Sequence, residues 1–339
     1  MRGGEARQAA RRWVARAAAA DPHYRGAYFT GSINDLPADA ELPPSSDVDL
    51  VVADARADPG LKLGKFRYEG ALLEVTHLPS DRFADPEAVL ADYHLAGAFR
   101  ADSIIDDPTG RLGAVHERVA RDFADPTWVR RRYADARARI VDRLAAVDPD
   151  GPWHEQVTRW LFGTGVTAHL PLVAALRNPT VRLRYPAARA ALTDLGRPDV
   201  YPELLRLLGA AHLTAARVHR HVDLLGRAFD AVAAVARTPF FFTSDLSPEA
   251  RPIAIDGSRE LVARGDHREA MFWVVATFAR CQAVFEADAP SLAREREGAF
   301  RAAAADLGIV SHDDIRRRAA EVRAALPVLD RDLLARVPG

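Results

Sequence analysis

The spacing of apolar residues changes about a third of the way along this chain of 339 residues. Up to about residue 107, short apolar runs of strand length alternate with turn residues. From about residue 126, apolar residues recur every three to four positions, which is the spacing of amphipathic helices. This order predicts an α+β fold, in which a domain with a mixed sheet and flanking helices (1–124) precedes an all-helical bundle domain (125–339).

The elements of the first domain follow from the same patterns. Strands are predicted over 26–31, 47–53 and 103–106, and helices over 86–97 and 110–122. Residues 65–79 predict two strands joined by a tight turn at Glu69-Gly70, because glycine readily adopts the positive φ that a hairpin turn needs.

Composition excludes several classes of protein. The formal net charge of −1 argues against a nucleic-acid binder, which usually carries a strong basic excess. Only Lys62 and Lys65 among the 46 basic residues are lysines, which we attribute to codon bias. A single cysteine, Cys281, excludes an internal disulfide and a metal site built from cysteines. No run of 18 apolar residues occurs and the Arg-rich N-terminus does not read as a signal peptide, so we expect a cytoplasmic protein with no membrane partner.

A pair of carboxylates stands at the start of a strongly apolar predicted strand. Asp47 and Asp49 flank Val48, and because side chains alternate along a strand, both carboxylates lie on one face. Neighbouring carboxylates beside an apolar core repel each other, and a divalent cation relieves that repulsion. Ligation by oxygen alone suits Mg²⁺, which is commonly held by one or two carboxylates together with substrate phosphates. The sequence therefore predicts a magnesium site at this pair.

Two further segments complete the predicted site. Glu74, in the run LLEVT, lies between apolar residues on a strand that we expect to pair with the strand of Asp49, so it offers a third carboxylate. Gly31 and Ser32 follow another apolar strand. Glycine lets the backbone approach a phosphate closely, and serine adds a hydroxyl and an N–H donor. Such a turn, opposite a metal held by carboxylates, would grip a nucleoside triphosphate from both ends.

Together these segments resemble the signature of the DNA polymerase β-like nucleotidyltransferases. The pattern here reads FTGS, then SSDVDLVV, then LLEVT, and covers about residues 26 to 80. A small catalytic domain before a helical domain is similar to the antibiotic-modifying members, and the SD-x-DL and LEVT strands resemble the streptomycin and spectinomycin adenylyltransferases. The resemblance implies that 1–124 is a nucleotidyltransferase catalytic domain and 125–339 a substrate-binding domain.

The resemblance also implies a reaction. A nucleoside monophosphate would pass from ATP or another nucleoside triphosphate to a hydroxyl of a small molecule, such as an aminoglycoside-like antibiotic or a natural product. Asp47 and Asp49 would bind two Mg²⁺ ions, and Glu74 would serve as third metal-binding carboxylate and catalytic base. Gly31 and Ser32 would contact the triphosphate.

Further candidate residues lie in the helical region. Because lysines are nearly absent, arginines must supply triphosphate contacts, and Arg177 and Arg182 are the candidates. Glu155 is a second candidate for the general base, although the helix dipole also favours an acid in a first helical turn. The long segment 238–261 interrupts the helices, and its Asp245, Asp256 and Glu260 are candidate contacts for a cationic acceptor.

Two alternatives stay open. The 14 residues between Ser32 and Asp47 form a longer, more acidic loop than is usual in this superfamily, and no Arg or Lys directly follows Gly-Ser. In one alternative, the chain is a nucleotidyltransferase that modifies a protein or a tRNA instead of a small molecule. In the other, which the missing basic residue favours, it is a catalytically inactive module that binds nucleotide. The near-neutral charge argues against tRNA. A homodimer is compatible with the sequence, although no residue argues for one.

Overall fold

The computed structural model describes residues 1–60, 62–148 and 150–337. These residues form two compact units. The first contains Met1–Arg132 together with Phe240–Ala250, and the second contains Tyr133–Pro239 together with Arg251–Gly339. The predicted α+β class and the mixed sheet are confirmed.

The first unit is built on a five-stranded sheet with the order β3-β4-β2-β1-β5. Its strands are β1 (Tyr24–Phe29), β2 (Val48–Asp54), β3 (Gly64–Tyr68), β4 (Ala71–Pro79) and β5 (Ile104–Asp106). β2 and β4 run parallel, and the other neighbouring pairs are antiparallel. The predicted turn between β3 and β4 is confirmed, since Glu69 and Gly70 both have positive φ, at 48° and 84°.

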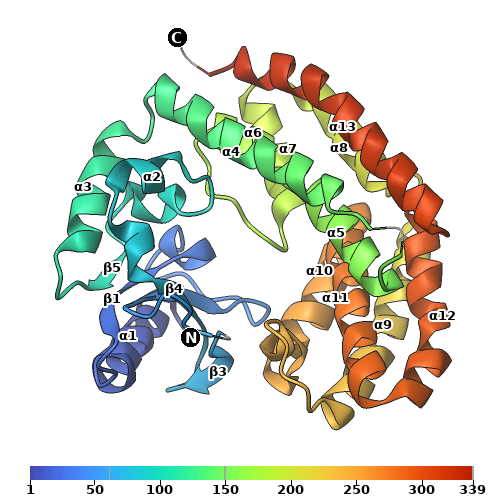
Figure 1. Ribbon diagram of the computed structural model, residues 1–339, viewed down its shortest axis with the longest axis horizontal. Coiled ribbons are helices and arrows are strands. Elements are labelled where there is room, and N and C mark those ends of the chain that lie inside the picture. The colour runs from blue at the N-terminus through green and yellow to red at the C-terminus, as the bar shows by residue number, and fades with distance from the viewer. Residues whose placement is uncertain (61, 149, 338–339) are drawn as a thin grey trace. The chain divides into compact units, whose positions relative to one another are not determined.

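Helices cover both faces of this sheet, as Figure 1 shows, with α1 on one side and α2 and α3 on the other. The helical elements are α1 (Gly3–Trp13), η1 (Val14–Ala18), η2 (Gly31–Asn34), η3 (Ser80–Phe83), α2 (Pro86–Ala91), η4 (Ala96–Arg100) and α3 (Arg111–Asp122). The predicted helix over 86–97 is wrong in its second half. Asp92 ends α2 because its carboxylate accepts hydrogen bonds from the N–H groups of His94 and Leu95, at 2.8 and 3.1 Å.

The alternation of side chains along β2 explains why this strand reads as almost continuously apolar. Val48, Leu50 and Val52 pack on the side of α1, whereas Val51 and Ala53 pack on the side of α2 and α3. Asp49 therefore belongs to the α2/α3 face, two residues before Val51. The apolar residues anchor the strand on both faces and hold Asp49 at a defined place on one of them.

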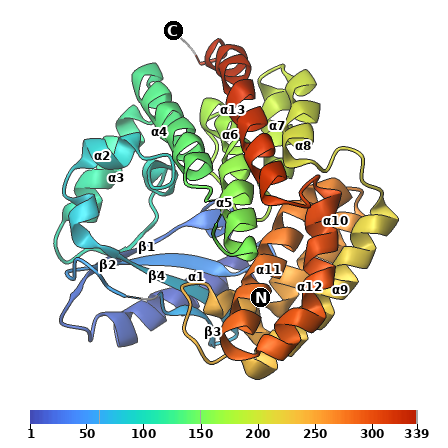
Figure 2. The ribbon, with the colours of Figure 1, turned by 45° about the vertical axis from the view of Figure 1, so that its right-hand side comes forward.

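The second unit is helical. After α4 (Pro126–Ala145), which continues into it from the first unit, it contains α5 (Trp153–Val166), α6 (His169–Ala174), α7 (Arg184–Asp194), η5 (Pro198–Val200), α8 (Tyr201–Leu208), α9 (Ala215–Val235), η8 (Pro252–Asp256), α10 (Gly257–Ala263), α11 (His267–Asp288), α12 (Pro290–Asp306) and α13 (His312–Leu334). Figure 2 shows α11 beside α9 and α12. α11 is buried along most of its length, which matches a helix that is apolar on all sides.

The segment that interrupts the helices in sequence belongs to the sheet-containing unit. Within Phe240–Ala250, the short helices η6 (Thr243–Leu246) and η7 (Pro248–Ala250) pack near β3. Gly64, the first residue of β3, makes this packing possible. A β-carbon on Gly64 would lie 2.2 Å from the β-carbon of Ser244, and Gly64 has a φ of 79°.

Candidate metal and nucleotide site

The register of the sheet brings three charged side chains into one row. Asp49 on β2 is the partner of Glu74 on β4, and Glu74 is in turn the partner of Lys65 on β3. Residues paired across neighbouring strands point to the same face. The predicted pairing of the Glu74 strand with the Asp49 strand is confirmed. Asp47 immediately precedes β2, and its carboxylate contacts Lys65 of the same row.

The three predicted metal-binding carboxylates meet in space. Asp47, Asp49 and Glu74 each offer an oxygen, and these oxygens lie within 4.8 Å of one another. Oxygens bound to the same Mg²⁺ are at most about 4.2 Å apart, because each lies about 2.1 Å from the ion. All three side chains are only partly buried, so a substrate phosphate or water can complete the coordination. The residues present therefore fit a divalent cation after a small adjustment of side chains.

Of the three carboxylates, Asp49 has the least compensation of its negative charge. Among the described residues, no Lys, Arg or His forms an ion pair with its side chain, whereas Asp47 and Glu74 both pair with lysine. Burial, together with the negative charges of Asp47 and Glu74, raises the pKa of Asp49 well above its usual value. A bound divalent cation would offset this destabilisation of the ionised Asp49 carboxylate.

The Gly31-Ser32 turn lies directly against this carboxylate. Gly31 has a φ of 69°, and a β-carbon there would lie 2.2 Å from Oδ2 of Asp49. The Thr30 N–H donates to the backbone carbonyl of Asp49 at 3.0 Å, which ties the turn to β2. Ser32 is exposed, so its hydroxyl is accessible to a ligand. The predicted glycine therefore lies directly beside Asp49 of the carboxylate pair.

The long loop after Ser32 is fastened to the start of α1. The N–H groups of Gly3 and Gly4 donate to the carbonyls of Ala40 and Ala38, both at 2.8 Å. Arg7 donates to the carbonyls of Ile33 and Leu36, at 2.7 and 2.9 Å. These bonds anchor the loop to the backbone of α1 and to the side chain of Arg7.

Both lysines of the chain lie at the carboxylate cluster, and the sequence patterns did not select them. Nζ of Lys65 contacts Oδ2 of Asp47 at 3.1 Å and Oδ1 of Asp245 at 3.0 Å, and it also bonds Glu74. Nζ of Lys62 bonds the other oxygen of Glu74 and lies 3.6 Å from Oδ1 of Asp245. The signal that could have revealed them is their rarity, because the remaining 44 of 46 basic residues are arginines.

These contacts set the charge state of Glu74. Burial by itself would raise the pKa of Glu74, but the positive charges of Lys65 and Lys62 outweigh it and lower the pKa to about 2. A general base works best when its pKa is near the operating pH. The environment of Glu74 therefore suits a residue that holds cations better than one that accepts a proton.

Asp245 adds a fourth carboxylate from a distant part of the sequence. It lies on η6, and its side chain is 10 % exposed. The sequence suggested this residue as a contact for a cationic acceptor, whereas in the structure it holds the two cationic lysines.

The other predicted site residues belong to the second unit, where they have partners of their own. Arg177 pairs with Asp194, and Arg182 donates to the carbonyl of Gly257 at 3.3 Å. Glu155 lies in the first turn of α5, 3.7 Å from Arg159. This position of Glu155 agrees with the helix-dipole interpretation.

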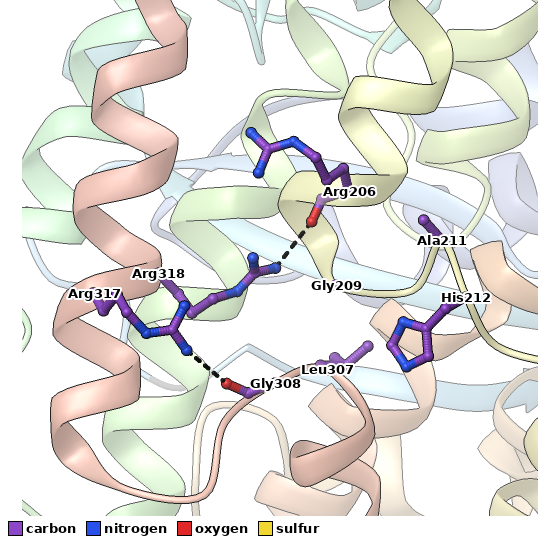
Figure 3. A pocket seen from close by; sticks show the side chains of 8 residues that line it. All are labelled: Arg206, Gly209, Ala211, His212, Leu307, Gly308, Arg317 and Arg318. Carbon is purple, nitrogen blue, oxygen red and sulfur yellow. Dashed lines mark hydrogen bonds between the residues drawn. The ribbon is translucent and has the colours of Figure 1, made fainter.

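A cavity of about 250 Å³ in the second unit is lined by several cationic groups (Figure 3). Each of its three arginines is paired with an acid on its own helix: Arg206 with Glu203, Arg317 with Asp314, and Arg318 with Glu321. Arg318 also donates to the carbonyls of Arg206 and Leu207, at 3.0 and 2.7 Å, and so caps the end of α8. The contacts of these arginines explain them as structural residues.

No helix among the described residues has the length and apolar character required to cross a membrane. Comparison with family models, curated proteins and solved structures finds no match to this chain.

Proposed function

We propose that this protein is a magnesium-dependent nucleotidyltransferase that moves a nucleoside monophosphate from ATP to a hydroxyl of a small molecule. The observation that carries the proposal is the meeting of Asp47, Asp49 and Glu74 beside the Gly31 turn. A divalent cation and a triphosphate need these two kinds of group close together, namely carboxylates for the cation and open backbone for the phosphates.

Each group has a role in such a reaction. Asp47 and Asp49 hold the cation, which supplies charge neutralisation for the transferred phosphoryl group. Gly31 allows the chain to pass close to Asp49, and the exposed Ser32 hydroxyl binds a phosphate oxygen. Glu74 fixes the two lysines, whose positive charges lie at the same cluster. The chemistry rests on positioning and charge, which is what phosphoryl transfer mainly requires.

The direct test is turnover. The protein is incubated with Mg²⁺, each of the four nucleoside triphosphates and a panel of aminoglycosides and related natural products, and pyrophosphate release is measured. We expect release with ATP and an acceptor that carries a hydroxyl, and none from the Asp47→Asn or Asp49→Asn protein. Absence of pyrophosphate with every combination would exclude a small-molecule acceptor from the panel. A labelled protein band with ATP in lysate would instead favour a protein acceptor.

One observation favours a second candidate, an inactive module that binds nucleotide. Lys65 already neutralises part of the charge on Asp47 and Glu74, so the cluster holds a cation without any metal. Two results together would support this candidate over the enzyme. The double variant Asp47→Ala/Asp49→Ala would still bind ATP, and the unaltered protein would show no turnover.

A further inference from the structure

Lys65 is enclosed by carboxylates in the way a bound cation would be. Its Nζ has three N–H groups and contacts one oxygen each from Asp47, Glu74 and Asp245. The side chain is 6 % exposed, so the ammonium group has exchanged water for these oxygens. Asp47 and Glu74 belong at the same time to the triad that fits a metal ion.

The two lysines supply positive charge directly to the carboxylate cluster. Asp47, Asp49, Glu74 and Asp245 bring four carboxylates together, and the ammonium groups of Lys62 and Lys65 lie among them. Two lysine side chains carry the same charge as one divalent cation, so the protein itself supplies the positive charge that a second ion would bring.

The chain uses lysine only here, although arginine is its cation everywhere else. The two residues differ in shape, since an ammonium group is a compact point charge and a guanidinium group is a broad planar fork. Only the compact group resembles a metal ion in size and in its ability to sit among three oxygens. The choice of lysine at this position therefore agrees with a cation-like role.

We propose that the Lys65 ammonium group, held by Asp245, takes the place of a second divalent cation, so that the site binds a single divalent ion at Asp47 and Asp49. The inference rests on the proposed function, which supplies the need for cations at the cluster. It also replaces the two-ion site that the resemblance implied. Glu74 is then an anchor for the lysines, because both of its oxygens are bonded to them.

Lys62 offers a matched control. It carries the same charge and contacts Glu74 and Asp245, but no contact joins it to Asp47 among the described residues. Lys65→Met and Lys62→Met each remove one positive charge from the cluster. Only Lys65→Met empties the position next to Asp47, so the pair separates the effect of position from the effect of net charge.

The experiment counts Mn²⁺ ions in the complex of the full chain with α,β-methylene ATP, a triphosphate that cannot release its nucleoside monophosphate. Electron paramagnetic resonance gives both the number of bound ions and the coupling signature of two neighbouring ions. We expect one uncoupled Mn²⁺ for the unaltered protein and for Lys62→Met, and two coupled ions for Lys65→Met. Lys65→Gln serves in the same way if the methionine variant does not fold.

The possible results separate the inference from the function. Two coupled ions in the unaltered protein, or one ion in both Lys65 variants, would overturn the role of Lys65 and leave the nucleotidyltransferase intact. Binding of Mn²⁺ and nucleotide that is insensitive to Asp49→Asn would overturn the proposed function, and the inference with it.

Discussion

Gly31 and Asp49 are packed so closely that a β-carbon on the glycine would lie 2.2 Å from Oδ2 of the aspartate. Gly31 also has a φ of 69°, in the region that favours glycine. The turn before the candidate phosphate-binding serine and the candidate metal ligand therefore depend on each other. A substitution at either residue should therefore alter the position of the other.

Gly31→Ala should destabilise the protein and disrupt metal binding. The left-handed backbone costs a residue with a β-carbon roughly 1–2 kcal/mol, and the new methyl group would push Asp49 out of place. Gly196→Ala is the control, since Gly196 has a φ of 68° and, chain neighbours aside, no atom of the described residues lies within 4 Å of where its β-carbon would be. Thermal melts should show a loss for both variants, and Mn²⁺ titration a loss for Gly31→Ala alone. Equal Mn²⁺ affinity in the two variants would contradict the coupling.

Asp49→Asn should lower the activity of the protein and raise its thermal stability. Loss of a metal ligand removes several kcal/mol of charge stabilisation in the transition state, which corresponds to about a hundredfold or more in kcat/KM. The same change relieves repulsion from Asp47 and Glu74, the charges that with burial raise the pKa of Asp49. We therefore expect a higher melting temperature than the unaltered protein in EDTA, and no further rise when Mg²⁺ is added.

Asp35→Asn is the control for this variant, because Asp35 lies in the loop after Ser32 and pairs with Arg100 instead of the cluster. Its melting temperature should keep its dependence on Mg²⁺. A lower melting temperature of Asp49→Asn in EDTA would show that Asp49 is already stabilised without a cation.

Gly64→Ala should loosen the segment that carries Asp245. A β-carbon on Gly64 would collide with Ser244, so η6 could no longer pack against the start of β3. Hydrogen exchange of Phe240–Ala250 should then become faster, and the contact of Asp245 with Lys65 should weaken. The double variant Gly64→Ala/Ser244→Gly lacks the colliding side-chain atoms, so exchange should become slow again. The backbone strain of alanine at position 64 remains in both variants. Slow exchange in the single variant would show that the segment is held by other contacts.

Asp54 should make the protein sensitive to acid. Its carboxylate is 1 % exposed and bonds Arg56 and His77, and the hydrogen bonds from Arg56 hold its pKa below the usual 3.8. Because the folded state binds this proton less readily than the unfolded chain, the stabilisation is present above pH 3.8 and is lost as the pH falls further. Urea unfolding of Asp54→Asn should show a shallower loss of stability between about pH 4 and pH 2. If the stability of Asp54→Asn and of the unaltered protein fell in parallel with decreasing pH, Asp54 would not be the source of the acid sensitivity.

The sequence by itself determined the order of elements and the local geometry of the site. Period-two alternation put Asp47 and Asp49 on one face, apolar neighbours turned Glu74 the same way, and Gly70 located the hairpin. These features depend on residues close in sequence, so a local pattern encodes them. The end of α2 was not predicted correctly, because the side chain of Asp92 binds backbone N–H groups that would otherwise continue the helix. The spacing of apolar residues contains no information about such a bond.

The tertiary structure decided what surrounds the carboxylates. Insertion of β4 between β3 and β2 put Lys65 beside Glu74 and Glu74 beside Asp49. Packing of η6 against Gly64 brought Asp245 to Lys65 across 180 positions of sequence. No local pattern specifies such contacts, because strand register and loop packing are selected by the combined burial and pairing of many distant residues. The candidate metal-binding pair could therefore be predicted from the sequence, whereas the lysines that accompany it could be placed only from the tertiary structure.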